Sequence, residues 1–307
     1  MDSMLQRRTA VLLASIAPWI AFAQAPATTP VDLLETKLRT HLQAIDERLH
    51  GVIGVAAIDL VTGRTLQYNA DAVFPTASTI KVPILIQAYH MARAGAFHWS
   101  DSITLQPSDS VGGSGLLQVA LARGPVTLTI EDLARKMIVD SDNTATNRVI
   151  AMIGIDRVNH LIATMGMRQT RLRRIMMDTP AAIRGDENVT TPLEMARIAE
   201  SIYRHKAADP ADCDSMVKIM KRVPGAIRFA VPQEVEVASK TGALPGVHCE
   251  VAIVYTAQRP FVLSVYSTFL DNEENPVGEV ARLFYEHFRD KLAPSNVYGN
   301  RVRDFGK

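Results

Sequence analysis

The β-rich segments of this 307-residue chain fall into two groups that lie far apart in the sequence. Residues typical of strands dominate two early segments and three late ones, at 52–61, 65–69, 234–239, 250–257 and 261–269. Strands joined by short, hairpin-like connections pair antiparallel. The chain therefore predicts one antiparallel sheet of five strands, with a long insertion between the second strand and the third.

Helical patterns occur in this insertion and near both ends of the chain. Leucine and isoleucine recur at helical spacing from Leu34 to Leu49, and residues 277–292 form a second amphipathic pattern. Within the insertion, the Thr-Pro-Leu-Glu sequence at Thr191 is typical of a capping box that starts a helix. The apolar faces of the terminal helices must be buried, and the sheet is the obvious surface for them.

These patterns predict a fold of the α/β (α+β) class: an antiparallel five-stranded sheet flanked by helices and interrupted by an all-α lobe. We expect one domain over residues 31–295. Its sheet lobe is expected to combine 31–70 with 226–295, and its all-α lobe to span 71–225, leaving 296–307 as a C-terminal tail.

The first 23 residues have the pattern of an export signal. Arg7 and Arg8 precede an apolar run of about 15 residues that ends in a small-x-small sequence at Ala23. Such a run is short for a membrane span, which needs about 20 residues. We expect cleavage near Gln24, a flexible leader over 24–30, no stable membrane span, and a periplasmic or secreted location.

Composition excludes several classes of protein. The formal net charge is +1, from 33 basic and 32 acidic residues, so a broad nucleic-acid surface is not expected. Two cysteines, Cys213 and Cys249, cannot form a disulfide framework or a four-thiolate metal site. They could pair in an oxidising compartment, but two ordinary buried cysteines are the simpler interpretation. The histidines show no metal-ligand spacing, so we expect neither a metal nor a cofactor.

A Ser-x-x-Lys motif joins Ser78 to Lys81 at the start of a predicted helix over 78–94. Residues three apart share a helix face, so the hydroxyl and the amine are expected to be neighbours. A serine needs a base before it becomes a good nucleophile, and a lysine can be that base when burial or a like charge lowers its pKa. In isolation, this motif is weak, and a helix start with a surface lysine is the more common interpretation.

Two further motifs follow in order. Ser141, Asp142 and Asn143 form a Ser-Asp-Asn sequence that joins two helical segments, and a Lys-Thr-Gly sequence begins at Lys240, at the end of a predicted strand. The first alone is a polar helix cap and the second alone is a strand-terminal turn. Together and in this order, the three motifs are far more specific than any one of them alone.

With this trio the chain resembles class A β-lactamases and their penicillin-interacting serine-enzyme relatives. The likeness extends over nearly all of the chain after the signal, including the glycine-rich flank 113–118 and the Thr191-Pro192 helix start. It implies that Ser78 attacks a carbonyl and becomes acylated, that Lys81 helps to remove its proton, and that Ser141 passes a proton to the leaving nitrogen.

The resemblance also implies the binding residues. Lys240 would help to keep Lys81 neutral and would attract the substrate carboxylate, and Asn143 would bind the amide side chain of the substrate. The backbone N–H groups of Ser78 and Ala243 would form an oxyanion hole. Thr241 and Gly242 complete the expected substrate-binding strand, beside Ala243.

Two departures from the family accompany these matches. The loop position that carries a water-activating glutamate corresponds to Met176, whose thioether cannot accept a proton from water. Asp178 lies two residues on, where it is either a surrogate base or a loop aspartate paired with Arg173 or Arg174.

The second departure concerns an arginine that often supports the substrate carboxylate. Its place, ten residues after Lys240, holds Glu250, which leaves Arg228 as a substitute or a surface charge and His248 as another candidate contact.

The resemblance implies a serine hydrolase that β-lactams acylate, and most directly a class A-type β-lactamase that hydrolyses the acyl-enzyme on Ser78. The alternative is a slow-releasing penicillin-binding protein, a D-Ala-D-Ala carboxypeptidase-like enzyme or an esterase-like enzyme. The expected substrate is a small β-lactam or a peptidoglycan-like molecule, and a monomer is expected.

Overall fold

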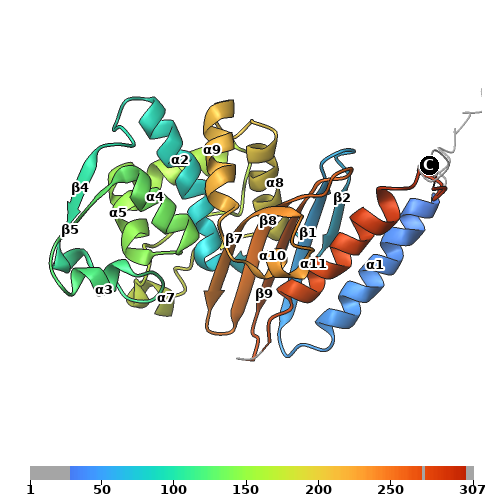
Figure 1. The fold of residues 1–307 in the computed structure, drawn as a ribbon. Coiled ribbons are helices and arrows are strands. Elements are labelled where there is room, and N and C mark those ends of the chain that lie inside the picture. The colour runs from blue at the N-terminus through green and yellow to red at the C-terminus, as the bar shows by residue number, and fades with distance from the viewer. Residues whose placement is uncertain (1–27, 272–273, 302–307) are drawn as a thin grey trace, which may run out of the picture.

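The computed structural model describes residues 28–271 and 274–301, and a five-stranded antiparallel sheet lies at its centre (Figure 1). The sheet confirms the predicted fold class. Its strand order is β2-β1-β9-β8-β7, so the early and late groups of strands meet where β1 pairs with β9. The strands are β1 (Val52–Asp59), β2 (Thr65–Tyr68), β7 (Glu236–Leu244), β8 (Val247–Tyr255) and β9 (Phe261–Thr268).

The terminal helices cover one face of the sheet. Helices α1 (Pro30–Asp46) and α11 (Val277–Tyr285) lie over it with the short α10 (Ala226–Ala230), and a π-helical turn (Glu286–Leu292) extends α11 (Figure 1). Their apolar side chains join one face of the strands in a single buried cluster. The predicted role of both amphipathic patterns is therefore confirmed.

The opposite face of the sheet packs against the helical insertion, through a second buried cluster. Two 3₁₀ turns lie in the insertion, at Ala77–Ile80 and Pro107–Asp109. Its other α-helices that matter for the packing are α2 (Lys81–Arg93), α3 (Leu117–Leu121), α4 (Ile130–Val139), α5 (Asn143–Ile153), α6 (Ile155–Thr164), α8 (Pro192–Tyr203) and α9 (Pro210–Met220). A further short helix, α7 (Thr179–Ile183), lies in the loop that follows α6.

The insertion differs from the predicted all-α lobe because it also contains two small antiparallel sheets. β3 (Phe74–Pro75) pairs with β6 (Val189–Thr190), and β4 (Ser102–Leu105) pairs with β5 (Val126–Thr129). Strands of two to four residues are too short for a two-residue periodicity to be recognised in a sequence. The β3–β6 pair has a consequence for the site, because it joins the chain just before Ser78 to the loop after α6.

The predicted capping box at the start of α8 is only half formed. The Thr191 hydroxyl accepts a hydrogen bond from the Glu194 backbone N–H, as predicted. The Glu194 carboxylate does not return to the N-cap, because it accepts hydrogen bonds from the backbone N–H groups of Arg168, Gln169 and Thr170 instead. This carboxylate therefore holds the beginning of the loop that leads to Met176.

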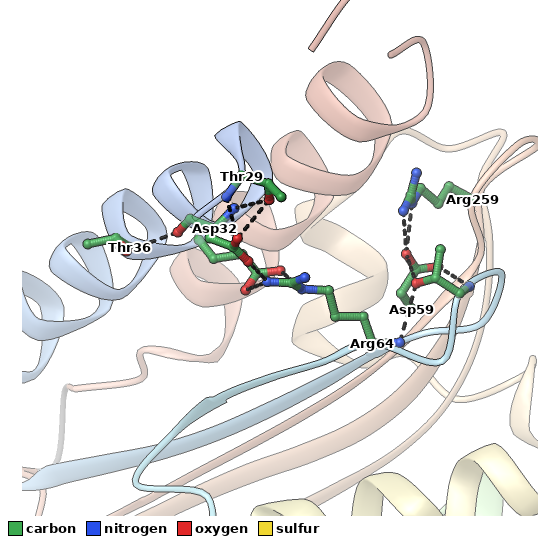
Figure 2. A network of polar contacts seen from close by, with 8 residues as sticks. Thr29, Asp32, Thr36, Asp59, Arg64 and Arg259 are labelled. Atoms are coloured by element: carbon green, nitrogen blue, oxygen red, sulfur yellow. Dashed lines mark hydrogen bonds and ion pairs between the residues drawn. The ribbon is translucent and has the colours of Figure 1, made fainter. Parts of the chain in front are cut away.

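Two charged clusters tie the outer helix and the strand ends together (Figure 2). The Arg64 guanidinium forms ion pairs with Asp32 and Glu35 of α1, and Asp59 pairs with Arg259 at 2.6 Å. Hydrogen bonds from Thr29, together with Arg64, lower the pKa of Asp32 to about 2. These contacts lie on the far side of the sheet from the three motifs, so they stabilise the fold rather than the site.

One prediction concerns residues that the structure does not describe, and for others the structure gives only partial information. The proposed signal lies outside the described residues and stays a prediction. In the described part of the chain, no helix is long and apolar enough to cross a membrane. Over the same residues, no group of three or more His, Cys, Asp or Glu side chains could hold a metal ion. Cys213 and Cys249 are both buried and unpaired.

Candidate active site

Ser78 lies in the 3₁₀ turn that leads directly into α2. The residue before it, Ala77, has φ = 43°, a left-handed conformation that costs free energy for a residue with a Cβ atom. Immediately upstream, the Thr76 backbone N–H donates to the Asn188 carbonyl at 2.8 Å. The hydrogen bond to Asn188 therefore helps to hold this turn in its strained conformation. Strained backbone of this kind is common at functional sites.

Lys81 is fully buried on the first turn of α2, and its ammonium contacts the Ser-Asp-Asn motif. The Nζ atom donates to the Ser141 carbonyl at 2.6 Å, to the Ser141 hydroxyl at 3.2 Å and to the Asn143 amide oxygen at 3.0 Å. Among the described residues, no hydrogen bond joins Lys81 to the Ser78 hydroxyl. Catalytic hydrogen bonds often tighten only when substrate binds.

Lys240 reaches the same serine from the sheet. Its Nζ atom donates to the Ser141 hydroxyl at 3.1 Å and to the Thr241 carbonyl at 2.9 Å. Ser141 therefore accepts hydrogen bonds from both lysines, which occupy the two lone pairs of its oxygen. Ser141 also lines the smaller of two cavities beside Ser78. Ser141 also has φ = 52°, a second strained position in the site.

The Lys-Thr-Gly motif lies inside β7, not at the end of a strand as predicted. The strand continues to Leu244 because Gly242 and Ala243 pair with Cys249 and His248 of β8. A Cβ atom on Gly242 would lie 2.6 Å from the Cys249 sulfur and 2.9 Å from the Thr76 carbonyl oxygen. Glycine is required here, because β7 passes directly against the turn that carries Ser78.

Burial lowers the pKa of both lysines. Desolvation lowers the pKa of Lys81 well below its ordinary value, and the nearby charge of Lys240 lowers it further, while Asp142 opposes the change. Desolvation also lowers the pKa of Lys240, to about 8. A neutral Lys81 amine can accept a proton, so the arrangement provides the base that the nucleophile needs.

Ser78 stands between two cavities that share three of their lining residues: Ser78, Ser114 and Ala243. The larger, of about 630 Å³, is the apolar cavity; its walls include Asn143, Met176, Met177, Leu244 and Val247. The smaller, of about 290 Å³, is the polar cavity; its walls include Ser141, Thr241, Gly242, His248 and Glu250. The eight residues predicted for the site therefore lie together. Six of them line one or both cavities, and the other two, Lys81 and Lys240, are buried behind Ser141.

The loop over 171–188 forms the outer wall of the apolar cavity. Met176 is buried in the loop, and its backbone exchanges two hydrogen bonds with the Asn147 side chain of α5, at 2.8 and 3.0 Å. Met177 has φ = 62°, and a Cβ atom on Gly113 would lie 3.0 Å from its sulfur. The two methionines thus close the space beside Ser78 with thioethers.

Asp178 also lines the apolar cavity, but its carboxylate caps α7 by accepting from the Ala181 backbone N–H at 3.1 Å. The predicted alternative, a pair with Arg173 or Arg174, is absent from the described residues, because Arg174 pairs with Glu187 at 2.8 Å. The Asp178 carboxylate is therefore occupied at a helix start.

Sequence reasoning missed two contributors to the site. The Ser114 carbonyl accepts from the Asn143 backbone N–H, and Ser114 lines both cavities; its glycine-rich flank was the available signal. The Asn188 side-chain oxygen accepts from the backbone N–H groups of Arg173 and Arg174, which holds the loop next to Thr76. A lone asparagine offers no pattern from which this role could be predicted.

The sequence left Arg228 as either a contact for the substrate carboxylate or a surface charge, and the structure gives it a different role. Its guanidinium donates to the backbone carbonyls of Val231, Pro232 and Val235, and Arg228 lines neither cavity. Carbonyls left without partners at the end of a helix attract such a side chain. His248 does line the polar cavity, where burial lowers its pKa.

The buried Lys240 predicts a pH dependence of stability. Its pKa is about 8 in the folded state and 10.5 ordinarily, so the unfolded state binds more protons between these values. The free energy of unfolding should therefore rise with pH in this window, by up to about 1.4 kcal/mol per pH unit. Urea denaturation of the wild type and of Lys240→Met, from about pH 8 to about pH 10, checks this sign. Parallel curves for the two proteins would show that Lys240 does not titrate there.

A serine that follows a strained alanine, two buried lysines and a second serine around one cavity mouth define a nucleophilic acyl-transfer site. Comparison with known proteins agrees with this chemistry. The sequence profile described as "Beta-lactamase enzyme family" matches residues 37–288, and the chain belongs to this family.

Individual relatives are distant but cover most of the chain. A β-lactamase from Sphaerobacter thermophilus is similar in structure, with a TM-score of 0.77 and 31% identity, over 82% of this chain and 97% of that one. A structure of PBP-A gives a TM-score of 0.74 at 25% identity, over 83% and 97%. The β-lactamase CTX-M-97 of Escherichia coli is 27% identical over 238 residues, which are 75% of this chain and 81% of that protein.

Proposed function

We propose that this protein is a serine hydrolase that β-lactams acylate at Ser78. The observation that carries the proposal is the convergence of Lys81 and Lys240 on the Ser141 hydroxyl, at 3.2 and 3.1 Å, beside the cavity mouth at Ser78. This arrangement supports a general base and a proton relay within a water-poor site, which are what a serine nucleophile requires.

In the proposed reaction the Ser78 oxygen bonds to the lactam carbonyl carbon, and the C–N bond then breaks. The proton of Ser78 passes to the neutral Lys81 amine, and the leaving nitrogen takes a proton from Ser141, which Lys81 replenishes. The backbone N–H groups of Ser78 and Ala243 act as the oxyanion hole. Donors of this kind are each worth about 3 kcal/mol in the transition state.

The rate at which the acyl group leaves Ser78 distinguishes two candidate functions, a β-lactamase and a penicillin-binding protein. A β-lactamase needs a base that activates water beside the acyl group. The loop presents Met176 to the apolar cavity, while Asp178 caps α7 and Glu187 is paired with Arg174. These contacts favour slow release of the acyl group, as in a penicillin-binding protein. Fast hydrolysis remains the second candidate, because the family relatives include named β-lactamases.

Intact-mass spectrometry separates the two candidates. The purified protein is mixed with penicillin G, and the mass is followed from seconds to hours. We expect a mass increase of one penicillin on Ser78 that persists long after the free drug is removed. Rapid return to the unmodified mass would identify a β-lactamase, and no mass change at all would contradict acylation by β-lactams.

A further inference from the structure

Met177 is the most accessible methionine in the described part of the chain, and it lies in the wall of the apolar cavity. It is 51% exposed, whereas every other methionine among the described residues is buried or half-buried. Oxidants convert methionine thioethers to sulfoxides, and exposed side chains react first. An oxidant in the surrounding solution would therefore meet a thioether at the active site before it met any other in this part of the protein.

The backbone around Met177 is held on both sides. Its carbonyl accepts a hydrogen bond from the Thr179 N–H at 2.9 Å, and Met177 itself has φ = 62°. The preceding Met176 is bonded to Asn147, and the following Asp178 caps α7. A chemical change on the Met177 sulfur is therefore not relieved by a simple shift of the loop, and its effect falls on the cavity.

The Met177 sulfur lies beside the side-chain amide of Asn143. A Cβ atom on Gly113 would lie 3.0 Å from this sulfur and 2.7 Å from the Asn143 amide nitrogen, so the two atoms are neighbours over the same glycine. The nitrogen donates to the Gly112 carbonyl at 3.0 Å. Its second hydrogen has no acceptor among the described residues, so this hydrogen is available to a bound substrate.

We propose that Met177 is a site of oxidative modification, at which a peroxide converts the thioether to a sulfoxide whose oxygen competes with the substrate for the Asn143 amide. This inference rests on the proposed function, because it concerns acylation of Ser78. With hydrogen peroxide, one oxygen bonds to sulfur as the O–O bond breaks, and the other leaves as water with both hydrogens. The sulfur loses two electrons and the peroxide gains them. A thioether is only a weak acceptor, whereas the sulfoxide is polar.

The two cysteines are poor competitors for the oxidant. Cys213 and Cys249 are both buried, and burial raises the pKa of each thiol, to about 12 for Cys249. Since the thiolate is the form of cysteine that reacts readily, neither side chain is expected to consume peroxide at neutral pH. Oxidation at low doses should therefore concentrate at Met177.

The test compares two acyl donors before and after treatment with hydrogen peroxide, once the oxidant has been removed. Penicillin G carries a side-chain amide, and 6-aminopenicillanic acid carries an amine in its place. Intact-mass spectrometry gives the rate constant for acylation of Ser78. We expect oxidation to slow penicillin G by about fivefold to tenfold, and 6-aminopenicillanic acid by less than about twofold, because only the first needs the Asn143 amide.

Peptide mapping locates the added oxygen. Trypsin cleaves after Arg174 and Arg184, and fragment ions of the peptide 175–184 distinguish Met176 from Met177. Methionine sulfoxide reductases, one for each epimer of the sulfoxide, should restore the rate with penicillin G.

Two variants serve as controls. Met177→Leu has an apolar side chain without sulfur, so peroxide should leave its rate with penicillin G equal to the rate of the same variant before treatment. Met165→Leu is the matched control, because Met165 is half-buried and lines neither cavity. This variant should be as sensitive to peroxide as the wild type.

Four results would overturn the inference and leave the proposed function standing. Peroxide fails to modify Met177, or modifies it without slowing penicillin G. Oxidation slows both donors by the same factor, which would indicate general damage to the site. Finally, Met177→Leu loses as much of its rate as the wild type does. If neither donor acylates the untreated wild type, the proposed function fails together with the inference.

Discussion

Ser78→Ala is expected to abolish the penicillin adduct, with a loss of more than about a thousandfold in acylation rate. The alanine variant keeps the strained turn, both cavities and the buried lysines, but it has no oxygen to form the acyl bond. Intact-mass spectrometry with penicillin G measures the loss directly, and circular dichroism confirms that the variant is folded.

The matched control for this variant is Ser114→Ala. Ser114 is the other serine that lines both cavities, and it is more exposed than Ser78. It lies in a glycine-rich loop, away from the start of α2 and without a hydrogen bond to either buried lysine among the described residues. We expect this variant to keep its adduct. If the adduct survives in Ser78→Ala but disappears in Ser114→Ala, the nucleophile is Ser114 and not Ser78.

Met176→Glu is expected to accelerate release of the acyl group by at least about a hundredfold. Met176 and Ser78 line the same apolar cavity, and the Met176 backbone is locked to Asn147. A carboxylate at this position would accept a proton from a water molecule beside the acyl carbonyl. The measurement is the decay of the penicillin adduct after free drug has been removed.

Two further variants test alternative explanations for the rate of acyl release. One is the entry of water into the cavity, and the other is a base at Asp178. Met176→Gln introduces a polar side chain of the same length as glutamate, but without a basic carboxylate. This variant should therefore release the acyl group nearly as slowly as the wild type. Equal acceleration by glutamine would show that entry of water, not a base, limits release. Asp178→Asn tests a second carboxylate that lines this wall. Because Asp178 caps α7, we expect unchanged release kinetics, and slower release would make Asp178 the surrogate base.

Much of the fold could be predicted because it depends on local patterns. The amphipathic helices α1 and α11 each show an apolar stripe at helical spacing, and each buries it on the sheet. The prediction was less accurate where a pairing partner decides the outcome. β7 extends through the Lys-Thr-Gly motif because β8 pairs with it to the end, and the β3–β6 pair joins segments with no strand pattern of their own.

The same division holds for the two charged residues at the edges of the site. Arg228 looked available for a carboxylate, since a sequence does not show that three backbone carbonyls already occupy its guanidinium. Glu250 looked like the loss of a binding residue. Only the packing around it shows that Glu250 lines the polar cavity, with its carboxyl group in the space left by Gly225.

The sequence by itself determined which groups take part, because the chemistry restricts the choice of side chains and a single helical turn brings Ser78 and Lys81 together. The tertiary structure decided their geometry and charge. Lys81 and Ser141 are 60 residues apart, and Ser141 and Lys240 are 99 apart, yet the two lysines meet at one hydroxyl. Their pKa values fall because packing removes water from around them, and that burial combines elements of both lobes rather than following from any local pattern.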